Sequence, residues 1–338
     1  MNTSFTLRAR AWRDGVCVAR DVDEDGLKAL IEDPTVLTWV DLVNPREEDL
    51  LRIAATVGLA PGSVEDALAP LERPKITRHP GHLFFMTYAT RRVGAVLEDP
   101  TDLTRLRMKR ISAFVLPSAL VTVRLPDRHG NRFDVEELMD RWEGQPELLR
   151  EGTSALVYGL LDMVVDGHFD TIQELDDEIE ALEDVLFEQG DTGRRFIRRV
   201  YALRKDLVRL RRVVLPMREV VNGLLRHRRR DEPVLDAYFD DLDDHVLRAA
   251  EWTESLRDLV ASVFETNLSL QDAKLNTVMK KLAGWAAIIA VPTAITGWYG
   301  QNVPYPGFQT HTGLIQSLSL ILIATVTLYL LFRSRDWL

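Results

Sequence analysis

The residues with the clearest chemistry are neutral oxygen donors in one short turn near the end of a 338-residue chain. Tyr299, Gly300, Gln301 and Asn302 directly follow an uncharged stretch, and a Gly-x-Asn pattern has meaning only because of that position. Asn302 offers an amide oxygen, and Gly300 permits a tight backbone that exposes neighbouring carbonyl groups. Such neutral oxygens suit a small, hard cation that loses its water slowly, because they can hold the ion with its hydration shell.

Two uncharged stretches, residues 283–299 and 314–332, lie on either side of the loop that carries this turn. A helix needs about 20 apolar residues to cross a bilayer, so both are long enough. The alternative is a buried helical hairpin in a soluble core. Lys280, Lys281, Arg333 and Arg335 flank the pair, whereas residues 300–313 contain no Lys or Arg. The positive-inside rule therefore predicts that both termini lie in the cytoplasm, and we expect the membrane to be the plasma membrane.

The two predicted spans differ in their side chains. The second is rich in Leu and Ile and is expected to face lipid, whereas the first contains Gly, Ala, Thr and Pro. Small and hydroxyl residues let helices pack closely or line a narrow pore. Two helices cannot enclose a pore, so conduction requires a closed ring of identical subunits in the lipid bilayer. The sequence thus predicts a homo-oligomer.

A stalk helix is expected over residues 233–281, continuing into the first span. No Gly or Pro occurs between Pro233 and Gly284, and apolar residues such as Leu235, Phe239 and Leu242 recur at helical spacing. A coiled-coil stalk that serves only oligomerisation is the simpler interpretation. A continuous rod could also carry motion from a cytoplasmic sensor to a membrane gate.

The first 150 residues are predicted to form an α/β domain. Strands are expected at 6–18, 37–42, 82–90 and 110–124, and helices at 25–32, 47–57, 63–69 and 134–142. Two long helices follow at 154–189 and 194–230, the first acidic and the second basic. An antiparallel hairpin would pair these charges in solvent, although the carboxylates could instead gather cations.

The predicted fold class is an α+β/α membrane protein. Its expected parts are a cytoplasmic α/β domain (1–150), a charged helical hairpin (151–232), the stalk (233–281), a pore-lining transmembrane helix (282–299), an extracellular loop (300–313), a second transmembrane helix (314–332) and a basic cytoplasmic tail (333–338).

Composition excludes several other classes. The net charge of −10 argues against a nucleic-acid binder, although a short basic run at residues 226–230 leaves that alternative testable through salt-dependent binding. Cys17 is the single cysteine, so an internal disulfide is impossible. No dinucleotide, phosphate-loop or His-Glu-x-x-His motif is present, so we expect neither an enzyme nor a bound cofactor.

The turn and its surroundings resemble the CorA family of magnesium transporters, also called the two-span GxN superfamily. Tyr299-Gly300-Gln301-Asn302 is similar to the family's Tyr-Gly-Met-Asn turn. The resemblance extends almost over the whole chain, through Trp39-Val40-Asp41-Leu42, Pro45, Arg73-Pro74-Lys75, Asn276, Val278-Met279-Lys280, Leu282, Pro292, Gly297 and the ending Arg333-Ser334-Arg335-Asp336-Trp337-Leu338.

This resemblance implies a homopentameric funnel that transports Mg²⁺, with residues 299–302 as its selectivity filter. Asn302 and Asn276 would contact the metal. Met279 or Leu282 would form an apolar constriction that gates by dewetting, although packing between stalks would explain both equally well. The pore-facing positions implied by the family are Asn276, Met279, Leu282, Ala283, Ala290, Thr293 and Gly297.

The resemblance also implies regulation by intracellular Mg²⁺. Asp241 matches a stalk carboxylate that helps to bind a regulatory ion between subunits, with Glu98, Asp99 or Asp102 of a neighbour as candidate partners. Loss of the ion would release repulsion between carboxylates and open the pore. An exposed stalk acid without this role is the alternative.

Two departures from the family pattern concern the metal. Gln301 replaces the usual Met, and residues 303–313 contain no Asp or Glu. We therefore expect Mg²⁺ first, with Co²⁺ or Ni²⁺ also carried, and a Zn²⁺ transporter, which could be proton-coupled, as the alternative. His311 is the one loop residue with affinity for softer metals. Neither span contains an ionisable proton relay, which favours a channel.

Overall fold

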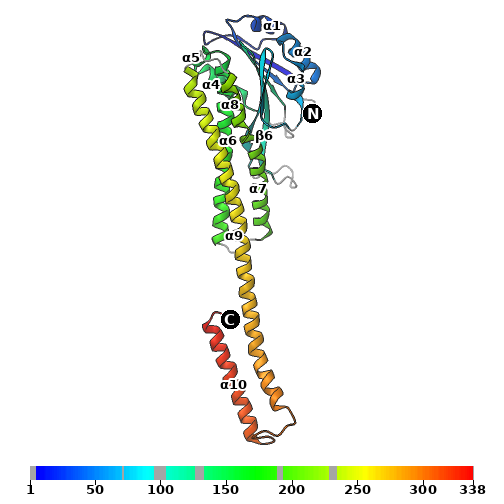
Figure 1. Ribbon diagram of the computed structural model, residues 1–338, viewed down its shortest axis with the longest axis vertical. Coiled ribbons are helices and arrows are strands. Elements are labelled where there is room, and N and C mark those ends of the chain that lie inside the picture. Colours follow the sequence, from blue (N-terminus) through cyan, green and yellow to red (C-terminus); the bar gives the residue numbers. More distant parts are fainter. Residues whose placement is uncertain are drawn as a thin grey trace. The chain divides into compact units, whose positions relative to one another are not determined.

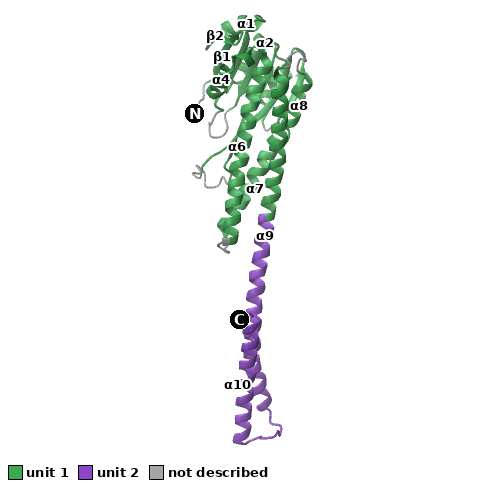
Figure 2. Cartoon of the chain, turned by 90° about the vertical axis from the view of Figure 1, so that its left-hand side faces the viewer, with its two compact units in different colours: residues 1–262 green, residues 263–338 purple. Residues whose placement is uncertain are grey.

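The structure, a computed structural model, describes residues 5–70, 72–94, 104–125, 133–188, 193–227 and 234–337. The chain divides into two units, residues 1–262 and 263–338, coloured green and purple in Figure 2. One long helix, α9 (Val234–Tyr299), contributes its first part to the first unit and its remainder to the second.

The first unit is built on a seven-stranded sheet of order β2-β1-β3-β7-β6-β5-β4 (Figure 1). Only β3 and β7 pair in parallel, and the other neighbours are antiparallel. The strands are β1 (Thr6–Arg13), β2 (Val16–Arg20), β3 (Leu37–Val43), β4 (Lys75–His79), β5 (His82–Arg92), β6 (Leu106–Val115) and β7 (Ala119–Arg124).

Helices cover both faces of this sheet. One face packs against α1 (Glu24–Glu32), α2 (Glu47–Val57) and α3 (Pro61–Leu68), and the other against α4 (Val135–Glu143), α6 (Thr153–Glu188), α8 (Met217–His227) and the start of α9. Strand alternation produces the two cores: Phe84 and Met86 point to the first group of helices and Phe85 to the second. The predicted α/β class of the N-terminal region is therefore confirmed as a sheet between two helical layers, while the bounds 1–150 stay a prediction.

Several expected strands need correction. Residues 6–18 form a hairpin rather than one strand, because Asp14 and Gly15 both adopt positive φ and reverse the chain. Residues 110–124 likewise divide into β6 and β7 at Leu116. The prediction also missed β4, a short edge strand that pairs with β5.

The long basic helix is also broken. Residues 194–227 form α7 (Arg194–Val214) and α8 instead of one helix, because Pro216 lies in a turn between them and cannot donate a backbone hydrogen bond. A four-residue helix, α5 (Pro146–Leu149), was not expected. The predicted start of the acidic helix, residue 154, lies one residue after the observed start of α6 at Thr153.

Charge pairing between α6 and α7 is sparser than the sequence suggested. Within the described residues, one ion pair joins the two helices, Glu178 to Arg199 at 3.7 Å. Glu178 also binds Arg92 and Arg105 at the ends of β5 and β6. The carboxylates of α6 therefore pair with α4, through Arg141, and with the sheet as well as with α7.

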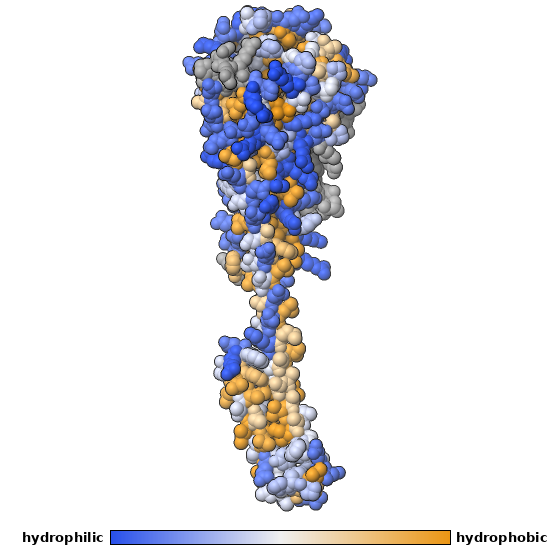
Figure 3. Space-filling model, in the orientation of Figure 1, coloured by the Kyte–Doolittle hydropathy of each residue, from blue (hydrophilic) through white to orange (hydrophobic). Residues whose placement is uncertain are grey.

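The second unit contains the end of α9, the loop and α10 (His311–Ser334), and its two helices lie side by side (Figures 1 and 2). Both α9 and α10 are long and apolar enough to cross a membrane. Apolar side chains dominate the surface where the two helices lie side by side (Figure 3). The structure thus contains the two candidate spans that the sequence predicted.

Candidate functional site

The predicted pore positions share one exposed face of α9. At about 100° per residue, they fall within a sector of about 120° around the helix axis. Met279 and Leu282 are 61% and 63% exposed, which is high for large apolar side chains. The residues of this face, all exposed, are Asn276, Met279, Leu282, Ala283, Ala290, Thr293 and Gly297.

The opposite face of α9 is the covered one within the second unit. Gly284 and Ile288 are buried there, and Val291 and Ile295 are half-buried. These four positions recur at helical spacing and point away from the exposed face by roughly half a turn. Within the described part of the chain, the face on which the family pattern places the pore therefore has no partner. The pore role of this face stays a prediction.

Pro292 lies inside α9 at the level of this exposed face. Proline cannot donate to the carbonyl four residues earlier, so the backbone ladder is interrupted at this point. The hydroxyl of Thr293 donates to the carbonyl of Ile289 at 3.0 Å, and that of Thr296 donates to the carbonyl of Thr293 at 3.0 Å. Each of these hydroxyls keeps an acceptor lone pair on the surface of the helix.

The Gly-x-Asn turn caps the end of α9. The amide of Gly300 donates to the carbonyl of Thr296 at 2.9 Å, and that of Gln301 to Trp298 at 3.3 Å. Gly300 does not adopt positive φ, so its freedom in the left-handed region is not what the turn uses. A Cβ at this position would lie 3.0 Å from the Thr296 carbonyl oxygen, which makes close approach the reason for glycine.

Asn302 follows as an exposed residue whose side chain makes no hydrogen bond within the described part of the chain. Its amide oxygen is free to accept hydrogen bonds from water, including the water of a hydrated cation. Gln301 is exposed beside it. The turn thus presents neutral oxygen donors, as the sequence indicated.

Contacts within the loop hold the turn against the start of α10. The hydroxyl of Tyr305 donates to the carbonyl of Tyr299 at 3.3 Å, and the two rings meet edge to face at 5.0 Å. Gly307, with φ of +92°, lies so close to Gly313 that a Cβ on Gly313 would be 2.2 Å from its carbonyl oxygen. The hydroxyl of Thr310 accepts from the amide of Gly313 as the N-cap of α10.

A protein-built metal cage is not found among the described residues, where no three His, Cys, Asp or Glu side chains gather in ligating geometry. His311 is exposed at the first position of α10. Asn276 and Asn302, the two predicted metal contacts, are both exposed side-chain amides of the second unit. One chain therefore supplies single neutral donors rather than a complete coordination shell.

Asp241 lies on the part of α9 that belongs to the first unit. Its carboxylate is 3.3 Å from Nδ1 of His245, one turn further on, and its side chain is 59% exposed. The candidate partners Glu98, Asp99 and Asp102 lie outside the described residues. Asp241 is thus an accessible carboxylate, and its regulatory role stays a prediction.

Sequence reasoning did not single out Asp162, which faces the same region from α6. Burial and the neighbouring Asp166 raise the pKa of Asp162, while Arg141 lowers it. The hydroxyl of Tyr158 donates to Asp162 at 3.3 Å, and burial, followed by Asp162 and then Asp241, raises the pKa of this phenol. The sequence pattern of this long acidic helix did not indicate that one of its carboxylates would be half-buried.

Comparisons with known proteins also indicate a cation transporter. The family model described as CorA-like Mg²⁺ transporter protein matches residues 35–334. A cobalt/magnesium transport protein CorA from Thermotoga maritima is 27% identical over 313 residues, which cover 90% of this chain and 85% of that protein. The cobalt/magnesium transport protein CorA from Methanocaldococcus jannaschii is 23% identical, covering 95% and 98%.

The fold comparison covers the complete chain. The complete structure of the CorA magnesium transporter from Methanocaldococcus jannaschii matches with a TM-score of 0.75 and 22% identity, covering 100% of both chains. Because the family model spans nearly the whole sequence, the chain belongs to the family of CorA-like Mg²⁺ transporter proteins, which are divalent-cation transporters.

Proposed function

We propose that this protein is a channel for hydrated Mg²⁺ in the plasma membrane, with Co²⁺ and Ni²⁺ also carried. The observation that carries the proposal is the exposed face of α9, which ends at the unpaired amide of Asn302. Two relatives are named as cobalt/magnesium transport proteins, which supports the same class of ion.

The chemistry of the turn suits a hydrated ion. Mg²⁺ demands near-ideal octahedral geometry and gives up water reluctantly, so stripping its shell would slow transport. A ring of amide oxygens from Asn302 can accept hydrogen bonds from the water shell without binding the ion too tightly to release it. Neutral donors therefore favour passage over capture.

A ring requires several copies of the chain. Two spans cannot enclose a pore, and from Ala283 to Gly297 the predicted pore positions of α9 are small or hydroxyl residues, where a lipid-facing helix would carry Leu and Ile. A closed cyclic homo-oligomer would place that face on the axis. The family resemblance points to a pentamer with both termini of each subunit in the cytoplasm.

Met279 and Leu282 are the candidate gate. Both are large, apolar and exposed on the pore-side face, so copies around an axis would make a narrow dry constriction. Regulation would come from intracellular Mg²⁺ bound by Asp241 and a neighbour's carboxylate. Loss of that ion would leave like charges facing each other and destabilise the closed state.

Transport of Zn²⁺ is the second candidate, and it rests on the loop. Gln301 replaces the usual Met of the turn, and residues 303–313 contain no carboxylate. Within each span, residues 283–299 and residues 314–332, there is also no Asp, Glu, Lys, Arg or His. A proton-coupled carrier would need a relay of such groups, so their absence favours a channel for either metal.

The deciding experiment is flux into liposomes that contain the purified full-length protein. Mg²⁺, Co²⁺, Ni²⁺ and Zn²⁺ are compared side by side, each with and without a proton gradient. We expect Mg²⁺ flux that does not depend on the gradient. A preference for Zn²⁺ would refute the first candidate in favour of the second. Failure to carry any of the four ions would refute both.

Regulation is tested in the same liposomes with Mg²⁺ inside. Asp241→Ala is expected to weaken inhibition by internal Mg²⁺ while leaving flux at low internal Mg²⁺ unchanged. Asp244→Ala is the matched control, since Asp244 lies on the same helix, is 60% exposed and pairs with Arg248 at 3.1 Å. Equal effects of the two substitutions would remove the specific role of Asp241.

A further inference from the structure

Two charged stripes run along helices of the first unit, and the transport function proposed above does not use them. The α6 stripe consists of Asp166, Asp170, Gln173, Asp177, Glu180 and Asp184. The α7 stripe consists of Arg194, Arg198, Tyr201, Lys205, Val208 and Arg212. Every one of these side chains is exposed. One helix thus presents mostly carboxylates to its surroundings, and the other mostly cations.

The two stripes have the same geometry. Successive positions in each are four, three, four, three and four residues apart. At about 100° per residue, the six positions of each helix fall within a sector of about 80°. The opposite sectors face the interior, where Leu175 and Leu182 of α6 and Leu203 and Leu210 of α7 are buried. Alternating steps of three and four residues form a straight seam along which a second helix can pack.

Most stripe charges have no partner within one chain. Among the described residues, Asp166 is the one stripe carboxylate in an ion pair, with Arg141 at 2.9 Å. The ion pairs of α7 in the same part of the chain use Arg199 and Arg211, which lie outside the α7 stripe. Tyr201, which is 60% exposed, adds a large ring among the unpaired cations. Both stripes are therefore available to a partner outside the chain.

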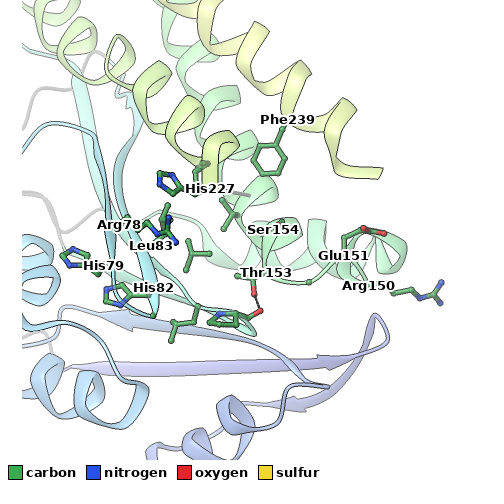
Figure 4. Close-up of a pocket in the computed structure, with 17 residues that line it drawn as sticks. Arg78, His79, His82, Leu83, Arg150, Glu151, Thr153, Ser154, His227 and Phe239 are labelled. Atoms are coloured by element: carbon green, nitrogen blue, oxygen red, sulfur yellow. Dashed lines mark hydrogen bonds between the residues drawn. The ribbon is translucent and has the colours of Figure 1, made fainter. Parts of the chain in front are cut away.

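A small molecule does not match the shape of these stripes. A cavity of about 500 Å³ lies at the first turn of α6, between the β4–β5 hairpin and the end of α8, and no stripe residue lines it (Figure 4). Arg198 borders a smaller cavity of about 140 Å³. Each stripe spans 18 residue steps, or about 27 Å of helix. A surface of this length fits another helix.

A second copy of this chain is the partner that both stripes fit. A polyanion would match the α7 stripe alone, and the net charge of −10 opposes its approach. The next copy offers a seam of opposite charge and equal spacing to each stripe. Because the two stripes lie on different helices, the contact is heterologous, and a heterologous contact can close into a ring.

The ring also sets a register between the stripes. Helices α6 and α7 run in opposite directions, and Glu178 pairs with Arg199 within one chain, so these residues lie at the same level (Figure 1). Rotation about an axis parallel to the two helices keeps each residue at its level. Five of the six levels are then complementary, and the pairs are Asp184 with Arg194, Glu180 with Arg198, Asp177 with Tyr201, Gln173 with Lys205 and Asp166 with Arg212. Asp170 meets Val208, the one level without a complementary pair.

We propose that the α6 stripe of one copy packs against the α7 stripe of the next, so that the first units form a closed ring. The inference rests on the proposed function in one respect, the homo-oligomer. Exposed ion pairs are individually weak and are screened by salt. The stripes therefore orient first units that the membrane spans already hold at high effective concentration.

The test is disulfide cross-linking of the full-length protein in detergent. Asp177→Cys and Tyr201→Cys are combined with Cys17→Ser, so the chain carries only the two introduced thiols. A disulfide forms only where two Cα atoms approach within about 7 Å. On oxidation we expect covalent multimers larger than the dimer, because each copy links to both neighbours. Either cysteine substitution alone should give no multimers.

Glu174→Cys combined with Arg204→Cys is the matched control. Both positions are exposed, and they lie at the same level of α6 and α7. Each is displaced by about 80° from the centre of its stripe, and in the proposed packing the two point to opposite sides of the seam. This pair should therefore give no multimers.

A charge exchange tests the register in the Asp177→Cys/Tyr201→Cys chain. Adding Arg198→Glu should slow multimer formation by about fivefold, because it places a like charge opposite Glu180. Adding Glu180→Arg to that variant should restore the rate. High salt should slow cross-linking of the parent pair, since it screens the attraction between the stripes.

Light scattering of the same samples reports the oligomeric state, so this proposal and the proposed channel can fail separately. An oligomer without cross-links, multimers in the control pair, or no rescue by Glu180→Arg would each overturn the stripe pairing and leave the channel untouched. Shielding of the Tyr201→Cys thiol by anionic lipid, without cross-links, would instead assign the α7 stripe to a membrane surface. A monomer would overturn both proposals.

Discussion

The two units of this chain bury their apolar side chains to opposite extents. The first has two continuous cores on either side of its sheet, with side chains such as Trp39 and Phe84 almost fully buried. In the described residues of the second unit, only Val263 and Ile288 are buried large apolar side chains. A soluble protein rarely exposes so large a continuous apolar surface, which agrees with the two candidate membrane spans of this unit.

This difference separates two kinds of substitution. Changes in the first unit should act on folding through contacts visible in one chain. Changes on the exposed face of α9 should act on transport with little effect on the stability of one chain, because their contacts lie outside it. Four pairs of substitutions, each with a matched comparison, test this separation.

The largest effect is expected for Asn302→Ala, which should lower Mg²⁺ flux by about 100-fold or more, because each copy would lose the proposed contact with the hydrated ion. Liposome flux measures the change. Thermal unfolding of the purified protein should be unaltered, since the Asn302 side chain makes no hydrogen bond within the described part of the chain.

Gln301→Ala is the control in the same turn, and it should leave most of the flux intact. The exposed amide of Gln301 precedes Asn302 but is not the proposed ring ligand. If Asn302→Ala left flux unchanged, the second unit would be a membrane anchor and the proposed filter would be wrong.

The next effect concerns a buried ion pair that links β3 to β7. Nε of Arg124 lies 2.9 Å from Asp41, which is fully buried, and Arg124 also donates to the carbonyl of Phe133 at 2.7 Å. Arg124→Met would leave a buried carboxylate without its partner, which should destabilise the first unit by about 3–5 kcal/mol. Hydrogen exchange of the β3 and β7 amides measures the change.

Arg13→Met provides the matched comparison. Arg13 pairs with Asp33 at 3.0 Å, but the two side chains are 51% and 36% exposed, so solvent screens the pair and its loss should cost far less than loss of the buried pair. Similar costs for the two arginine substitutions would contradict the role assigned to the buried pair.

A smaller effect depends on pH and on His168, which is buried on α6. Its Nε2–H donates to the carbonyl of Tyr88 at 2.8 Å, and burial lowers its pKa to about 4. In the unfolded chain, the imidazole of this histidine binds a proton near pH 6.5. Between about pH 6.5 and pH 4 the unfolded state therefore binds a proton that the folded state does not bind. Stability of the first unit should therefore fall as the pH falls through that window, by about 3 kcal/mol at most.

His168→Gln should flatten this part of the pH dependence, because Gln can donate to Tyr88 without titrating. Hydrogen exchange of α6 amides between pH 7 and pH 4 compares the two proteins. His227→Gln is the control, since His227 is exposed. An unchanged slope in the His168→Gln protein would show that another group dominates this window.

The smallest effect concerns two glycines of the second unit. Gly313→Ala would place a Cβ 2.2 Å from the carbonyl oxygen of Gly307, so we expect a loss of about 1–3 kcal/mol in the stability of the loop. A Cβ on Gly297 would meet nothing within 4 Å in one chain. Gly297→Ala should therefore not lower thermal stability, and any loss of flux that it causes would report contacts between copies.

The sequence by itself determined the features that depend on local pattern. Uncharged length defined both candidate spans, the absence of Gly and Pro between Pro233 and Gly284 indicated the long helix, and the position of Asn302 after the first span identified the turn. Each of these signals lies within one segment of the chain. Hydrophobic periodicity is a local property, so it survives without knowledge of the fold.

Only the tertiary structure decided which distant segments meet. The parallel pairing of β3 with β7 brings Asp41 to Arg124, and the packing of α6, α8 and the β4–β5 hairpin brings Ser154, His227 and His82 around one cavity. The sequence does not predict these contacts, because they join residues that are 60 or more positions apart. Burial and unpaired polar atoms are set by such long-range contacts, which no local pattern contains.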